Sequence, residues 1–277
     1  MSVDRRGDGA AGPGLWALGL GAWGLAQALW LRADHRLTEG DVLTNVGALE
    51  LFHQEAERTG LWTVLRRAWT EDFGEYPALV PALQGWATQA LGVTDLSGDG
   101  PALVGLGWMV LLLWGTVSLA RRLAPGSQAW AGGLLLLSPW VAGLGRHVLL
   151  EPPMAALLLC SLALGARAWG GEHPHDVADP GGASEGEGEG EGEGERAGGA
   201  AMWAAWAASG ALAGAALLAK QTALLVLGPA GLVAGLLALR SPRDRRTQRL
   251  AGTAVAASTA ALLAGPWYLR RLGAESA

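Results

Sequence analysis

Long runs of apolar residues recur along the whole chain, separated by short polar connections and by two long ones. A run of about twenty apolar residues matches the thickness of the hydrocarbon core of a bilayer, so each run predicts a membrane-spanning helix. The pattern predicts an all-α, polytopic membrane protein with about seven transmembrane helices. The predicted spans cover residues 13–31, 101–120, 128–145, 153–169, 201–219, 222–239 and 251–268.

The first long connection, residues 32–100, is long enough to hold helices of its own. Apolar residues recur there at helical spacing, and polar residues occupy the opposite face, which predicts an amphipathic helix on the membrane surface. The apolar positions are Val42, Val46, Leu49, Phe52 and Ala56, and the polar ones are Asn45, His53, Gln54 and Glu57. The later stretch "YPALVPALQGWATQALGV" is apolar but contains two prolines, which favours an interfacial or re-entrant helix over an eighth span.

The second long connection, residues 170–200, alternates glutamate with glycine. Such a segment lacks apolar side chains, repels itself and has high backbone entropy, so it is predicted to be a disordered acidic loop. His173 and His175 lie in it, but two histidines without rigid spacing are more often solvated than metal-bound. On this view the whole chain, residues 1–277, is a single transmembrane module.

Composition agrees with a membrane protein, because 51% of the residues are hydrophobic and only 16% are charged. The net charge of −5 says little about partners, since about a third of the acidic residues lie in residues 170–200. We find no basic footprint for nucleic acid. Cys160 is the only cysteine, so an intrachain disulfide is impossible, and its place inside a predicted span favours a small apolar filler.

The positions of arginine predict the orientation, because positive residues tend to remain on the cytoplasmic side. With a cytoplasmic N-terminus, that side holds Arg5, Arg6, Arg121, Arg122 and the arginine cluster of residues 240–249. The opposite side then holds Arg146, Arg270, Arg271 and several arginines of the first long connection, so the difference over the whole chain is modest and the cluster is the strongest indication. Residues 32–100 and 146–151 then lie outside the membrane on the opposite face.

Ionisable residues at the ends of spans are the best guide to function, because a charge at the centre of a bilayer costs about 2.5 to 3.5 kcal/mol on insertion scales. Three places on the same predicted face qualify: Asp41 at the start of the surface helix, the loop "GRHVLLEPPM" with Glu151, and Lys220 between two spans. Each also has a structural explanation. Asp41 and Glu151 suit helix N-termini, and Lys220 can extend to the interface.

Carboxylates and cations at one membrane depth suit a charged ligand or a metal ion. A lipid-linked phosphate is the natural candidate, because its tail stays in the bilayer while its headgroup meets the cations at the interface.

The order of features resembles the membrane-embedded glycosyltransferases of the C superfold, specifically the bacterial relatives of protein O-mannosyltransferases and of the lipid A aminoarabinose transferase. The resemblance rests on Asp41 after the first span, "EYPALVPAL", "ARRLAP", "LLLLSPWVAGLGRHVLLEPPMAALLLCSLAL", "GALAGAALLAKQTALLVLGPAGL" and "GPWYLRRL". It covers nearly the whole chain through the order and spacing of these segments. The family usually has an acidic pair where this chain has Asp41, with Glu39 displaced. Members usually continue through more spans, which leaves a truncated fragment, a minimal module and an inactive relative open.

The resemblance implies a multi-pass protein of the cell (inner) membrane that works as a hexosyl- or pentosyltransferase. It would move a sugar, with inversion, from a polyprenyl-phosphate donor to a lipid, glycan or protein acceptor. Asp41 would be the general base, and Glu151 would shape the same pocket or help to hold a divalent cation if one is used. Arg146 and Lys220 would offset charge on the departing phosphate, and Tyr76 and His147 are assigned to substrate binding. Arg66 and Arg67 are weaker phosphate candidates, because arginines on a surface helix usually face water.

Two other classes stay open. A transporter or flippase of lipid-linked sugars would also need interfacial charges, but it predicts paired inverted halves, and we find no convincing internal repeat. A noncatalytic membrane partner would use the same acids only at helix starts.

Overall fold

The computed structural model describes residue 25 and residues 41–68, 72–73, 76–77, 79–93, 100–138, 150–170 and 191–275. Within these ranges the chain is mostly helical, with short turns between the helices and one antiparallel pair of two-residue strands, β1 (Asp72–Phe73) and β2 (Tyr76–Pro77). Five helices in the described ranges are long and apolar enough to cross a membrane. The structure thus confirms the class of an all-helical, polytopic membrane protein.

The predicted spans agree with the helices in most places. Four of them correspond to α5 (Gly100–Leu123), α8 (Glu151–Gly170), α10 (Leu224–Arg240) and α11 (Arg243–Glu275). The span predicted at 201–219 is the second part of α9 (Glu191–Ala219). The helix therefore also includes residues 191–200, the last ten residues of the segment that we predicted to be disordered. The span predicted at 128–145 is described only to residue 138, and its helix is the ten-residue α6 (Gln128–Leu137). The span predicted at 13–31 lies outside the described residues except for Leu25.

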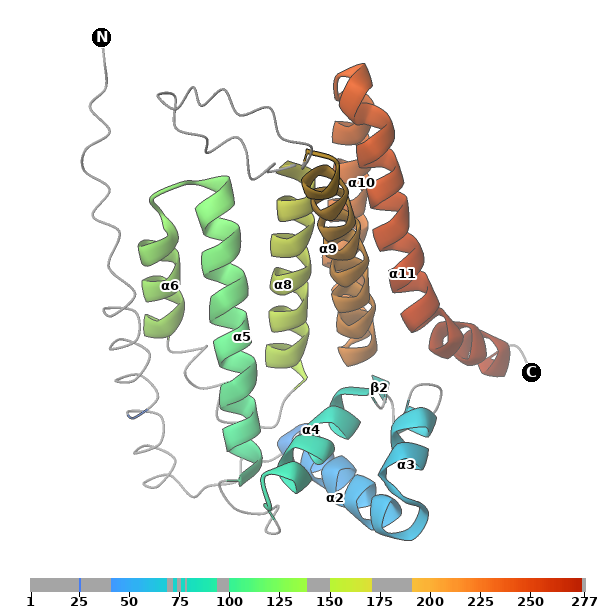
Figure 1. Cartoon of the computed structure of the whole chain (residues 1–277). Helices are drawn as coiled ribbons and strands as arrows, with labels where there is room; N and C mark the ends of the chain where they lie inside the picture. The colour runs from blue at the N-terminus through green and yellow to red at the C-terminus, as the bar shows by residue number, and fades with distance from the viewer. Residues whose placement is uncertain are drawn as a thin grey trace.

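The bundle is built from neighbours in the order α6, α5, α8, α9, α11 and α10 (Figure 1). Glycine and serine allow the central helices to approach closely, as is common where membrane helices pack without a hydrophobic driving force. The Ser161 hydroxyl donates to the backbone carbonyl of Ser209 at 2.8 Å, and the Ser209 hydroxyl donates to that of Ser161 at 2.9 Å. Gly210 faces the backbone of Ala256 so closely that no Cβ would fit. These contacts join α8 to α9 and α9 to α11.

The outer helix α10 turns most of its apolar side chains away from the protein. Its exposed large apolar residues are Leu224, Leu225, Val226, Leu232, Val233, Leu236, Leu237 and Leu239. An exposed apolar surface of this extent is typical of a helix that faces lipid.

The α2–α4 unit, formed by α2 (Asp41–Thr59), α3 (Leu61–Ala68) and α4 (Leu79–Ala90), lies at one end of the bundle (Figure 1). The helices predicted in the first long connection are therefore present. The apolar face of α2, which we predicted to rest on the membrane, instead packs on the protein: Phe52 is buried with Ala56, Val64 and Ala82. His53, predicted to lie on the polar face, is partly buried, and its Nε2 lies 3.0 Å from Thr88 Oγ1 of α4. Trp62 remains 82% exposed on α3, so contact of this unit with a membrane stays a prediction.

The two ends of the bundle differ in the number of arginines that they carry. Eight described arginines belong to the helix ends farthest from the α2–α4 unit, which we call the arginine-rich end: Arg121, Arg122, Arg167, Arg240, Arg243, Arg245, Arg246 and Arg249. Arg270 and Arg271, near the other end of α11, and the arginines of the α2–α4 unit do not belong to it. The start of α8 and the turn between α9 and α10 lie at the other end, next to the α2–α4 unit (Figure 1). The predicted grouping of residues by membrane face therefore agrees with the fold.

Candidate functional site

Glu151 opens α8 at the end of the bundle that carries the α2–α4 unit. Pro152 and Pro153 follow it, and proline is tolerated there because the first N–H groups of a helix have no intrahelical acceptor. Both prolines are buried, which anchors the helix start in the protein. The carboxylate of Glu151 also suits the positive end of the helix dipole.

Lys220 lies in the turn between α9 and the short 3-10 helix η2 (Gln221–Ala223). Its backbone is extended, with φ −158° and ψ 130°, so the chain leaves α9 here before it enters the next span. The backbone N–H of Lys220 still donates to the carbonyl of Ala216 at 3.1 Å. This turn places the lysine side chain beside the start of α8.

The Lys220 ammonium donates a hydrogen bond to Glu151 Oε1 and forms an ion pair with it. The side chains are 20% exposed for Lys220 and 35% for Glu151. An apolar cluster adjoins them: it includes Leu150, the neighbour of Glu151, and Ala219, the neighbour of Lys220, together with Val80, Leu157, Leu158, Ala216 and Ala223. Partial removal from water strengthens the attraction between the charges, so the pair holds the start of α8 against the end of α9.

Three of the segments that carried the family resemblance meet at this end. β2, with Tyr76 and Pro77, contacts α9. Trp267 is buried against Leu218 of α9, and Tyr268 donates its hydroxyl hydrogen to the carbonyl of Leu217 at 3.3 Å. The Tyr-Pro segment, the lysine turn and the Pro-Trp-Tyr segment are thus neighbours, although they are far apart in the sequence.

Among the residues that the structure describes, two buried polar atoms near this cluster have no hydrogen-bond partner: Gln84 Oε1 on α4 and Trp108 Nε1 on α5. Gln84 is one turn from Val80, a member of the apolar cluster, and the Trp108 ring packs against the same cluster. Buried polar atoms are nearly always paired, so an unpaired acceptor and an unpaired donor suggest groups that could serve a ligand. The sequence pattern does not predict a role for either group. Gln84 is visible as a polar residue inside an apolar run, whereas nothing distinguishes Trp108 among 14 tryptophans.

The remaining candidate residues are placed only in part. Asp41 is the first residue of α2 and Tyr76 belongs to β2, but their side chains lie outside the described part. Arg146 and His147 lie outside it entirely, as do His173 and His175. Of the weaker candidates, Arg67 pairs with Glu55 at 2.7 Å on the exposed surface of the α2–α4 unit.

No cluster of three or more His, Cys, Asp or Glu side chains suited to a metal ion occurs in the part of the chain that the structure describes. The chemistry that the described site offers is therefore that of a carboxylate and an ammonium at the end of a membrane bundle. Neither family models, nor curated proteins, nor solved structures match this chain.

Proposed function

We propose that the chain is a glycosyltransferase that moves a sugar from a polyprenyl-phosphate donor to a hydroxyl or amine at the outer face of the cell membrane. The observation that carries the proposal is the Lys220–Glu151 pair, which holds a cation at the end of the membrane bundle, beside the α2–α4 unit. A lipid-linked phosphate would reach this depth with its tail still in the bilayer.

In the proposed reaction, the acceptor oxygen or nitrogen attacks the anomeric carbon while Asp41 takes its proton. The bond from the anomeric carbon to the phosphate oxygen breaks, and its electron pair leaves with polyprenyl phosphate. Proton removal by a positioned carboxylate typically contributes a factor of about 10² to 10⁴ in rate. Lys220, together with Arg146, would stabilise the charge that grows on the phosphate, and Glu151 would position the ammonium.

The neighbourhood of the pair supports a binding site for more than a phosphate. Tyr76 and His147 are the proposed contacts to the sugar or acceptor. Gln84 Oε1 and Trp108 Nε1 are an unpaired acceptor and an unpaired donor near the apolar cluster that adjoins the pair. A sugar carries many hydroxyl groups, which can pair with both kinds of atom.

A second candidate is a noncatalytic membrane partner, and one observation favours it. Glu151 lies in the first turn of α8 and already has Lys220 as a partner, so a purely structural role accounts for both charges.

The test uses the full chain in lipid nanodiscs, supplied with a pool of polyprenyl-phosphate sugars and acceptors. Released or transferred sugar is measured by mass spectrometry for the parent protein and for the variants Asp41→Asn, Glu151→Gln and Lys220→Met. Glu57→Gln serves as the control, because Glu57 is an exposed glutamate near the end of α2 opposite to Asp41.

We expect sugar transfer by the parent and the control, a loss of at least about 10²-fold in Asp41→Asn, and smaller losses in the other two variants. Transfer that survives Asp41→Asn would exclude the proposed base. Movement of the intact lipid-linked sugar across the bilayer without cleavage would indicate a transporter instead. Absence of both cleavage and movement in a folded protein would favour the noncatalytic partner.

A further inference from the structure

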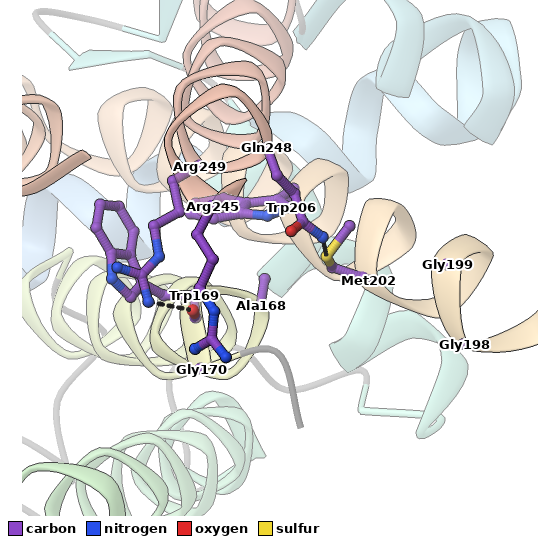
Figure 2. Close-up of a pocket in the computed structure, with 10 residues that line it drawn as sticks. All are labelled: Ala168, Trp169, Gly170, Gly198, Gly199, Met202, Trp206, Arg245, Gln248 and Arg249. Atoms are coloured by element: carbon purple, nitrogen blue, oxygen red, sulfur yellow. Dashed lines mark hydrogen bonds between the residues drawn. The ribbon is translucent and has the colours of Figure 1, made fainter. Parts of the chain in front are cut away.

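A small pocket lies at the arginine-rich end, opposite the Glu151–Lys220 pair. Figure 2 shows it between three helices: the last residues of α8, the membrane-entry part of α9 and the first turns of α11. It has a volume of about 130 Å³. The lining residues are Ala168, Trp169, Gly170, Gly198, Gly199, Met202, Trp206, Arg245, Gln248 and Arg249.

The pocket lies at the level where the apolar spans end. Gly170 closes the span in α8, Gly198 opens the span in α9, and Arg245 opens the span in α11. All three helices therefore place the pocket at the boundary between hydrocarbon and water. Tryptophan is enriched at this depth because its ring is apolar and its N–H is polar.

Arg249 is held in a fixed orientation by neutral groups. Its Nη1 donates to Ser241 Oγ at 2.8 Å, its Nη2 donates to the carbonyl of Trp169 at 3.4 Å, and its guanidinium lies 5.0 Å from the centre of the Trp169 ring. These partners carry no negative charge. The described lining residues of the pocket include two arginines and no carboxylate.

The walls are closely packed and leave space next to Gly198 and Gly199. Trp169 and Trp206 form an edge-on pair with ring centres 6.0 Å apart, and Trp206 fits against Gly252 so closely that a Cβ there would collide with the indole. Gly198 and Gly199, by contrast, face open space. Such a site can receive a group without rearranging, which lowers the entropic cost of binding.

We propose that this pocket binds a phosphate group through Arg245 and Arg249. The planar guanidinium presents paired N–H donors that match the oxygens of a phosphate, and charge-assisted bonds of this kind are about twice as strong as neutral ones. Pockets for drug-sized molecules measure roughly 300 to 1,000 Å³, so the smaller volume fits a headgroup phosphate or a free phosphate rather than a nucleotide. The site is independent of the proposed glycosyl transfer.

Two arms of one experiment distinguish the sources. In the first, native mass spectrometry measures retention of phosphatidylglycerol relative to phosphatidylcholine after the full chain is released from mixed nanodiscs. In the second, thermal unfolding in a phosphate-free detergent is followed with inorganic phosphate or with chloride at equal ionic strength. The variants are Arg245→Gln and Arg249→Gln. Arg246→Gln is the control, because Arg246 is an exposed neighbour on α11 and does not line the pocket.

We expect preferential binding in at least one arm, and a loss of about tenfold or more in affinity in both pocket variants but not in Arg246→Gln. A response to phosphatidylglycerol alone identifies a lipid headgroup, and a response to inorganic phosphate identifies the free anion. Arg249→Lys keeps the charge without the planar fork, and intermediate binding by this variant would support bidentate contact even if Arg249→Gln unfolds. No preference in either arm, or a preference equal in the pocket variants and the control, would overturn the proposal.

Discussion

Lys220 and Glu151 are 69 residues apart in the sequence, yet the lysine ammonium donates directly to the glutamate carboxylate. The contact connects the end of α9 to the start of α8 at the same end of the bundle as the α2–α4 unit. It gives each charge a partner at a depth where either alone would be costly. The pair is therefore both a structural link and the centre of the proposed site.

A double-mutant cycle on this pair separates its coupling from the effects of the single changes. We expect Glu151→Gln and Lys220→Met each to lower thermal stability, and the double variant to lose less than the sum, with a coupling of about 1 kcal/mol. The reason is that either single change removes the opposite charge that lies beside a partly buried one. Thermal unfolding in detergent with and without each change provides the measurement.

The Glu55–Arg67 pair provides the matched control, because Arg67 is 47% exposed whereas Lys220 is 20% exposed. Its coupling should be smaller, below about 0.5 kcal/mol, since water screens exposed charges. The two glutamates are similarly exposed, so equal coupling in the two pairs would show that the lower exposure of Lys220 adds nothing.

Gly210 is predicted to be essential for the packing of α9 on α11. A Cβ at this position would meet the carbonyl oxygen of Ala256, so Gly210→Ala must push two backbones apart and should cost about 1 to 3 kcal/mol. Gly231→Ala in α10 is the control, because a Cβ there meets no atom and alanine favours a helix more than glycine. The melting temperatures in detergent compare the two variants. A Gly210→Ala protein as stable as Gly231→Ala would be incompatible with this close approach.

The two reciprocal hydrogen bonds between Ser161 of α8 and Ser209 of α9 should contribute modestly to the stability of the protein. Ser161→Ala or Ser209→Ala removes one donated bond of the pair, and hydrogen bonds between membrane helices are worth about 0.6 kcal/mol on average. The double variant should lose less than about 2 kcal/mol, because replacing both hydroxyls leaves no buried donor without an acceptor. Thr259→Val is a comparison that removes a hydroxyl outside this interface, because Thr259 donates only to the carbonyl of Val255 within α11. If either single variant failed to fold, the two serine hydrogen bonds would contribute far more to stability than this estimate.

The hydrophobic pattern predicted the helices of the bundle well because a membrane demands long apolar runs whatever their neighbours are. It also grouped Glu151 with Lys220, since each residue lies at a span end on the same predicted face. Contacts within the α2–α4 unit were less predictable. The pattern identified an apolar face on α2 but could not distinguish lipid from α3 and α4 as its partner, and Phe52 proves to be buried in protein.

Other features depend on which helices become neighbours, and no local pattern contains that information. For example, three helices contribute Trp169, Trp206 and Arg249, and only the packing of the bundle brings these residues around one pocket. The early start of α9 at Glu191 shows a different limit: the glycine and glutamate composition favours disorder, while the apolar run that follows can extend a helix backwards.

The orientation of the bundle predicts which sites react with a membrane-impermeant thiol reagent. The arginine-rich end should face the cytoplasm, because positive residues are retained there. In whole cells, a cysteine introduced by Glu57→Cys on α2 should react, whereas one introduced by Arg246→Cys on α11 should react only after the membrane is opened. The native Cys160 is 5% exposed inside α8 and should stay unlabelled in both conditions, which makes the parent protein the control. Reaction at position 246 and protection at position 57 in intact cells would reverse the orientation and place the Glu151–Lys220 pair on the cytoplasmic side. The proposed transfer would then have to occur at the inner face.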